Sequence, residues 1–175
     1  MHMRIKLREL MEENWEAVHA YASLEQACRY QPWGPNTEAE SKQFVEEVLQ
    51  DAEEEPRKRY VYAIIFEEKM IGSAELRINS TQNQEGEIGY IIHPDFWNKG
   101  FATEAAKAVL SIGFRGFGLH RIYATCDPNN LASATVLEKI GMQKEGFIRE
   151  HIRMKSSWRD SFLYSMLEQE HPQEW

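Results

Sequence analysis

A short run in the middle of the chain has the side chains and spacing to bind a phosphate group. Lys99 and Thr103 flank Gly100 directly after an apolar run typical of a strand, at the start of a helical pattern. The first amide N–H groups of a helix lack partners and the helix dipole adds positive charge, so an anion is stabilised there. Gly100 has no side chain to fill the space that the phosphate needs. The expected binding turn comprises Asn98, Lys99, Gly100, Phe101, Ala102 and Thr103.

Two common phosphate-binding motifs do not fit this turn, and cysteine chemistry is also disfavoured. A nucleotide-kinase loop needs a Gly-Lys-Ser/Thr ending and the dinucleotide fingerprint needs three glycines, neither of which occurs around Gly100. Cys28 and Cys126 stand far apart without metal-ligand spacing, so we expect reduced thiols and no metal. Cys126 ends a predicted strand near the site, but no base is recognisably paired with it.

The composition bounds the class of protein. The chain has 175 residues, enough for one domain over residues 1–175, and no apolar run approaches the roughly 18 residues of a membrane span. Its first residues lack the apolar run of a signal peptide, so we expect a cytoplasmic protein. A net charge of −8 argues against a nucleic-acid partner and suits a cationic acceptor. A solvated helix face explains the acidic run between residues 38 and 55 more simply than an acceptor site does.

The elements before the turn are expected to form the first part of a sheet and its covering helices. Residues 3–10 alternate apolar and charged side chains, which is the period of a half-buried strand. Helical spacing over residues 11–27 predicts one or two short helices, which end at the prolines and glycine of residues 30–36. Thr37 and Glu40 form a capping box that begins the next helix. Runs of β-forming residues predict strands over 60–66, 70–79 and 87–93.

The elements after the turn alternate between helices and strands before a closing hairpin. The helix that starts at Gly100 is expected to end near Gly116, and residues 121–126 predict the next strand. A second helix over residues 131–140 is expected to end at Gly141. We therefore expect a mixed α/β domain. Its last elements are strands over 142–153 and 160–167 and a frayed end over 170–175.

The turn resembles the acyl-CoA-binding motif of the GNAT superfamily of N-acetyltransferases, Gln/Arg-x-x-Gly-x-Gly/Ala, through Trp97-Asn98-Lys99-Gly100-Phe101-Ala102. Trp97 stands where Gln or Arg is usual, which costs little if main-chain amides do most of the binding. A second motif over residues 129–142 again resembles GNAT proteins, and the run 93–105 is similar to the RimJ/RimL-type branch, whose best-known members acetylate protein N-termini. Over essentially the whole chain, the resemblance implies the GNAT fold, an α/β (mixed α+β) domain with a central, mostly antiparallel mixed sheet flanked by helices.

The resemblance also implies how acetyl-CoA would lie. With the diphosphate on the turn, the acyl end would follow the strand over residues 87–93, whose splayed end offers N–H groups from about Ile91 and Ile92. Asn129 or Asn130 would hold the pantetheine arm. The scheme needs acetyl-CoA as its cofactor and no metal.

The resemblance places the acceptor beside the helical insertion between the first two strands. Tyr30 and Trp33 would then be walls of the acceptor site, although packing of their loop onto the sheet explains them equally well. The proton lost by the attacking amine needs an acceptor, and Glu87 is the candidate base because it begins the strand that carries the acyl group. A solvated acid at a strand edge is an equally good reading of Glu87. Histidine is a common general base, but the place of His93 before Pro94 favours a structural role.

The departing thiolate needs a proton or a hydrogen bond. Many GNAT proteins place a Tyr for this purpose where this chain has Leu137. Asn130, Ser133 and Leu137 share one helical face, so Ser133 is the available hydroxyl. In RimJ/RimL-type proteins a Ser at this position is associated with the thiol. Ser133 could instead satisfy only the helix backbone.

The expected activity is transfer of acetyl from acetyl-CoA directly to a primary amine, with a protein N-terminus as the leading acceptor. A small-molecule amine such as a polyamine or an aminoglycoside is the rival acceptor. The absence of Tyr at Leu137 also leaves open an acyl-CoA-binding module without turnover. Neither nucleic acid nor a membrane is expected as a partner, and the chain is expected to act as a monomer or a homodimer.

Overall fold

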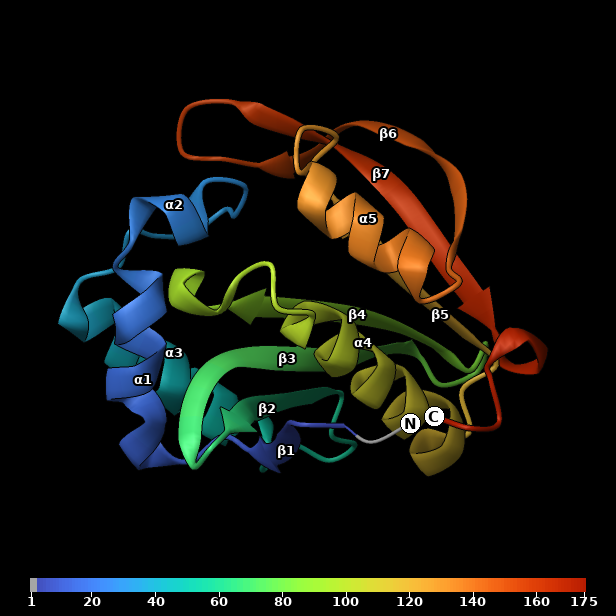
Figure 1. Cartoon of the computed structure of the whole chain (residues 1–175), viewed down its shortest axis with the longest axis horizontal. Helices are drawn as coiled ribbons and strands as arrows, with labels where there is room; N and C mark the ends of the chain where they lie inside the picture. The colour runs from blue at the N-terminus through green and yellow to red at the C-terminus, as the bar shows by residue number, and fades with distance from the viewer. Residues whose placement is uncertain (1–2) are drawn as a thin grey trace.

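A computed structural model describes residues 3–175, in which one sheet of seven strands carries helices on both faces (Figure 1). Its strand order is β1-β2-β3-β4-β5-β7-β6, and every neighbouring pair is antiparallel except β4 and β5. This mixed, mostly antiparallel sheet confirms the expected fold class. The strands are β1 (Lys6–Glu9), β2 (Arg59–Phe66), β3 (Lys69–Ser80), β4 (Glu85–Ile92), β5 (Arg121–Cys126), β6 (Gln143–Arg153) and β7 (Trp158–Leu167). The α-helices are α1 (Trp15–Ala22), α2 (Glu25–Cys28), α3 (Glu38–Asp51), α4 (Phe101–Ser111) and α5 (Leu131–Lys139), with short 3-10 turns over Glu12–Asn14, Pro94–Phe96 and Glu168–Glu170.

The capping box predicted for α3 is present. The Thr37 hydroxyl accepts a hydrogen bond from the backbone N–H of Glu40 at 3.2 Å, and the Glu40 carboxylate accepts one from the Thr37 N–H at 2.7 Å. These two bonds satisfy amide groups that a helix start would otherwise leave unpaired. The bonds that the Thr37 N–H and the Thr37 hydroxyl donate to the Glu40 carboxylate hold the pKa of Glu40 below its usual value. The helix therefore begins at the residue that the sequence indicates.

Two apolar cores lie on opposite faces of the sheet. One is covered by α4, which lies in front of β3 and β4 in Figure 1, and the other is covered by α1 and α3. Strand β2 is buried on both faces: Ile64 packs toward α4, while Val61 and Ala63 pack toward α1 and α3. Burial on both faces agrees with the nearly continuous run of β-forming residues in this strand.

The only parallel pair of the sheet is short, and it opens along its length. Residues 85–87 of β4 pair with residues 121–123 of β5. Beyond Glu87, β4 continues to pair with β3 as far as Ile92, whereas β5 pairs only with β7 up to Cys126. The second half of β4 therefore has one unpaired side that faces away from β3.

Several predicted element ends were wrong. Strand β1 is shorter than the predicted 3–10, α4 ends at Ser111 and gives way to a π-helical turn over Ile112–Gly116, and β7 begins at Trp158 rather than at residue 160. Strand β4 begins at Glu85 rather than Glu87, because the chain enters the sheet through the pairing with β3. The residues expected to fray at the end of the chain are packed instead: His171 is 6% exposed, and Trp175 contacts its ring. The Arg115 guanidinium donates to the backbone oxygens of Pro172 and Trp175, and this contact fixes the segment.

No helix among residues 3–175 has both the length and the apolar character that a membrane crossing requires.

Candidate active site

The loop that joins β4 to α4 is folded back onto the strand that it leaves. The Trp97 indole N–H donates to the carbonyl oxygen of Ile92 at 2.7 Å. The Lys99 ammonium group donates to the carbonyl oxygen of Asp95 at 2.8 Å. These contacts hold the loop in a tight turn whose residues 97–100 are exposed.

Left-handed backbone at two positions shapes the start of α4. Gly100 has φ of +83° and Asn98 has φ of +58°, a region that glycine and asparagine adopt most readily. Gly100 is the N-cap, and its carbonyl oxygen accepts from the N–H of Glu104 at 3.1 Å. The amides of Ala102 and Thr103 belong to the first turn, where N–H groups have no intrahelical partner. The structure thus brings the expected phosphate-binding residues together at one helix start.

Phe101 contributes differently from its neighbours. Its side chain is 2% exposed and packs against the ring of Phe66 with 4.6 Å between centroids, so it belongs to the core. Only its main chain can face a ligand at the turn. The aromatic side chain therefore fixes the direction in which α4 leaves the sheet.

A contact that sequence reasoning missed holds this turn to the N-terminal segment of the chain. The Arg4 backbone N–H and its Nε donate to the Glu104 carboxylate at 2.8 and 2.7 Å. Its Nη2 donates to the Lys99 carbonyl oxygen at 2.6 Å. No local pattern could indicate a contact between residues 100 positions apart.

The register of β4 decides which main-chain groups face the opening between β4 and β5. The His93 N–H donates to Ile71 of β3 at 2.7 Å, whereas the Gln84 carbonyl oxygen accepts from the N–H of Arg121 on the side of β5. Because successive residues alternate sides, the main-chain groups of Tyr90 and Ile92 face the opening. Those of Ile91 face β3 instead. The sequence predicted the N–H groups of Ile91 and Ile92 as donors. In this register the Ile92 N–H faces the opening, whereas the second N–H that faces it belongs to Tyr90 rather than to Ile91.

The start of α5 borders the same opening. The Asn130 side-chain oxygen caps the helix by accepting from the N–H of Ser133 at 3.1 Å. The Ser133 hydroxyl lies 3.3 Å from the Tyr90 hydroxyl, so its partner is a side chain of β4 rather than the backbone of its own helix. Burial raises the pKa of Tyr90 above its usual value. Asn129 is exposed and donates to the Asp127 carboxylate at 2.8 Å through its N–H.

The Leu137 side chain brings no polar group to this cluster. It is 1% exposed and packs in the core beneath α5, one helical turn beyond Ser133. Helix α5 has Leu137 where a tyrosine was expected, and Tyr90 of β4 instead brings a phenol hydroxyl to Ser133, one turn away. Sequence reasoning missed Tyr90 because it lies on β4, 43 residues before Ser133.

The two cysteines are structural. The Cys28 thiol donates to the Ala22 carbonyl oxygen at 3.1 Å, and Cys126 is 4% exposed at the end of β5. Burial is the main cause that raises the pKa of both thiols. Both thiols are therefore mostly protonated near neutral pH, and a protonated thiol is a weak nucleophile.

Glu87 projects from β4 on the face of the sheet that α1 and α3 cover. Its carboxylate accepts a hydrogen bond from the Tyr123 hydroxyl of β5 at 3.3 Å. Burial, reinforced by the negative charge of Glu87, raises the pKa of Tyr123 to about 12. Strand β4 lies inside the sheet rather than at its edge, and the half-buried Glu87 lines a cavity on this face.

That cavity has a volume of about 920 Å³ and lies between the sheet and the helical insertion. Trp33 lines it, as expected for an acceptor wall, but Tyr30 does not. The Tyr30 carbonyl oxygen instead accepts from the Arg159 guanidinium at 2.9 Å, which links the loop after α2 to β7. Gly89 also lines the cavity, and a Cβ placed on it would meet no atom within 4 Å. The space in front of Gly89 is therefore open.

Charges of both signs surround this cavity. The carboxylate of Glu75 lies 3.0 Å from Arg59 and 2.7 Å from Arg77, so one negative charge is shared by two positive ones. Arg59 also pairs with Asp51 at 2.9 Å. The other charged residues that line the cavity are Glu40, Glu47, Glu87 and Lys155.

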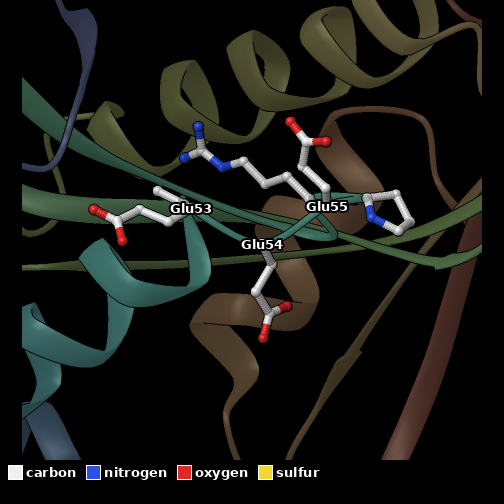
Figure 2. A pocket seen from close by; sticks show the side chains of 6 residues that line it. Glu53, Glu54 and Glu55 are labelled. Carbon is white, nitrogen blue, oxygen red and sulfur yellow. The ribbon is translucent and has the colours of Figure 1, made fainter.

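A second hollow of about 710 Å³ lies in the loop between α3 and β2. Figure 2 shows that its three acidic residues, Glu53, Glu54 and Glu55, point in different directions. All three are exposed, and they do not converge on a common point. The carboxylates of this loop are therefore not arranged to act together on a ligand.

Across residues 3–175, no three His, Cys, Asp or Glu side chains gather in a way that could hold a metal ion.

Comparisons with known proteins place these features in a family. The family model described as an acetyltransferase (GNAT) domain matches residues 4–143. The chain is 36% identical over 167 residues to the uncharacterized N-acetyltransferase YnaD of Bacillus subtilis, covering 95% of each chain. It is 26% identical to the spermidine N(1)-acetyltransferase of Escherichia coli, covering 90% of this chain and 82% of that one. An acetyltransferase of the GNAT family from Bacillus anthracis superposes with a TM-score of 0.83 at 35% identity, covering 97% of this chain and 98% of the other.

Proposed function

This chain belongs to the GNAT family and is an acetyl-CoA-dependent N-acetyltransferase, and we propose that its acceptor is the N-terminal amine of a protein or peptide. The observation that carries the proposal is the cavity beside Glu87, which is wide and charged with both signs. An N-terminus presents one amine followed by peptide carbonyl groups. The carboxylates suit the amine, and the cations of the cavity suit the carbonyl groups.

The residues at the start of α4 fit coenzyme A. The left-handed Gly100 and the free N–H groups of the first helical turn suit a diphosphate, and the opening between β4 and β5 suits an extended arm. When bound, acetyl-CoA supplies an activated acyl group. The N–H groups of Tyr90 and Ile92 face the opening and can donate to the arm and to the thioester oxygen. A well-placed donor to that oxygen contributes about 3 kcal/mol to the barrier reduction.

Two groups of the chain would handle protons. Glu87, held by the Tyr123 hydroxyl, takes the proton that the amine loses when its nitrogen bonds to the acyl carbon, directly or through a water. The carbon–sulfur bond breaks in the same reaction, and the leaving sulfur needs a hydrogen-bond donor. The paired hydroxyls of Tyr90 and Ser133 can supply it, since the raised pKa of Tyr90 keeps its proton on at neutral pH.

The size of the cavity suits a peptide, whereas its charge does not separate the two acceptors. Arg59 and Arg77 are already paired with Asp51 and Glu75, so a bound amine meets Lys155 together with three carboxylates, Glu40, Glu47 and Glu87. The similarity to a spermidine acetyltransferase favours the polyamine instead. The RimJ/RimL-type resemblance of residues 93–105 favours peptides, and ribosomal-protein N-termini are its leading candidates.

The test is the release of free thiol from acetyl-CoA over a panel of acceptors. The panel holds peptides that differ in their first residues, the same peptides with a blocked amine, spermidine and an aminoglycoside. We expect acceptor-dependent release with free peptides and none with blocked ones. A kcat/KM for spermidine at least tenfold above that of every peptide would show that the acceptor assignment is wrong.

A further inference from the structure

We propose that Arg4 is a phosphate-binding residue of the coenzyme A site, and that its guanidinium group takes the place of the Gln or Arg that the family motif has at Trp97. This inference rests on the proposed binding of the coenzyme at the start of α4. It assigns a role to a residue that lies before β1, far from the motif in the sequence.

The Trp97 side chain stabilises the fold of the loop. Its indole has a single N–H donor, and that donor binds the Ile92 carbonyl oxygen at 2.7 Å. The indole therefore has no polar hydrogen left for a phosphate. A cationic donor at this turn must come from another residue. Lys99 donates one of its three ammonium hydrogens to the Asp95 carbonyl oxygen at 2.8 Å, and Arg4 is the second cation at the turn.

Arg4 lies at the turn and is fixed there. Its guanidinium group stacks over the Phe101 ring, 4.4 Å from the centroid, while Nε and Nη2 bind Glu104 and the Lys99 carbonyl oxygen. Such a charge-assisted fork holds a planar guanidinium in one orientation. The side chain is nevertheless 45% exposed, so it can still meet a ligand.

The free donors of Arg4 point to a ligand at the turn. A guanidinium has five N–H hydrogens, and its Nη1 group makes no hydrogen bond within residues 3–175. A Cβ built on Gly100 would lie 3.4 Å from Nη2, so Arg4 borders the space that this glycine leaves open. The space between Gly100 and Arg4 is thus lined by main-chain amides and a cation, as a phosphate requires.

The partnership with Glu104 explains why a cation is needed here. Glu104 is 6% exposed in the first turn of α4, where its negative charge would repel a phosphate at the same helix end. Arg4 pairs with this carboxylate and still has hydrogens to donate. Arg4 would therefore cancel the repulsion and contribute direct phosphate contacts.

The first test compares Arg4→Met with Arg8→Met, a matched control at an exposed arginine of β1. The dissociation constant of coenzyme A is measured by calorimetry, and turnover is measured with S-acetylpantetheine, which lacks the phosphates. We expect Arg4→Met to weaken coenzyme A binding at least tenfold and to leave S-acetylpantetheine turnover unchanged. Arg8→Met should change neither quantity. Wild-type coenzyme A affinity in Arg4→Met would overturn the proposal.

A second test separates a direct contact from neutralisation of Glu104. The double variant Arg4→Met, Glu104→Gln leaves no unpaired buried carboxylate, so it also serves if the single variant fails to fold. We expect it to bind coenzyme A at least tenfold more weakly than Glu104→Gln alone. Equal affinities of these two variants would refute the direct contact. Failure of the wild-type chain to bind coenzyme A would instead reject the proposed function itself.

Discussion

The turn proposed to bind phosphate and the cavity proposed to bind the acceptor are built in opposite ways. The turn is a continuous run, residues 97–103, shaped by left-handed backbone and short-range hydrogen bonds. The cavity instead draws its walls from α1, α3, β2, β3, β4, β6 and the loop after α2. One therefore depends on local conformation and the other on how distant segments pack. Variants that disturb only one of them show how independent the two sites are.

The largest effect is expected at Gly100. Valine at φ of +83° is strained by about 1–2 kcal/mol, and its side chain would occupy the space assigned to the phosphates. We expect Gly100→Val to abolish coenzyme A binding in calorimetry. The matched control is Gly118→Val, also at positive φ but in open space, which should lower stability alone. Equal coenzyme A affinities of the two variants would remove the turn from the site.

Glu87→Gln tests the cavity side of the comparison. Removal of a general base lowers turnover by about 10²-fold or more, while the distant turn should keep its coenzyme A affinity. The pH–rate profile of the variant should lose the limb that corresponds to the base. Glu47→Gln, at another carboxylate of the same cavity, is the control. A wild-type profile in Glu87→Gln would end the assignment of Glu87.

Gly89→Leu would separate acceptor binding from coenzyme binding. The backbone at Gly89 needs no glycine conformation, and the new side chain would extend into the open cavity. We expect KM for the acceptor to rise about tenfold, equivalent to about 1.4 kcal/mol, with coenzyme A affinity unchanged. Gly146→Leu, on β6 where a Cβ also meets nothing, is the control for the loss of glycine. An unchanged acceptor KM in Gly89→Leu would place the acceptor elsewhere.

Tyr90→Phe addresses the point where the two sites meet. Loss of its hydroxyl removes the side-chain partner of Ser133, worth about 1 kcal/mol, so kcat should fall roughly fivefold. Ser133→Ala should give a similar loss, and the double variant should be no worse than either single variant, because the hydroxyls act as a pair. Fully additive losses, measured by steady-state kinetics, would show that the two groups act separately.

The smallest effect concerns stability at alkaline pH. The folded pKa of Tyr123 is raised to about 12 from an unfolded value of about 10, so the folded state binds more protons between these values. Stability should be undiminished below about pH 10 and fall as pH rises toward 12. Denaturation by urea should show a shallower fall for Tyr123→Phe. Parallel curves for the two proteins would contradict the assigned pKa.

The sequence predicted the parts of the site that depend on neighbouring residues. The Thr37–Glu40 capping box, the strand before the turn and the glycine at the start of α4 all follow from local rules, and the structure has each of them. Residues 98–103 could be grouped for the same reason. Their role toward coenzyme A remains a proposal.

The groups that were missed come from long-range pairing. Arg4 reaches Glu104, Tyr90 reaches Ser133 and Tyr123 reaches Glu87 only because the fold brings segments together that are distant in the sequence. The choice between Ile91 and Ile92 as donors required the register of β4 against β3, which single-sequence patterns do not fix. Tyr30 could not be told from Trp33 because both lie in one irregular loop.

Strand β4 lies between the two proposed substrate sites. Residues 87–91 all line the cavity proposed for the acceptor, while Ile88 and Ile92 also belong to the core beneath α4 and the Tyr90 hydroxyl meets Ser133 of α5. A register shift of one residue would exchange the side chains on the two faces of β4, so an insertion in this strand should abolish activity. Conversely, substitutions at Gly89 and Ile91, which leave Glu87 in place, offer a way to change the acceptor without changing the residues proposed to bind the acyl donor.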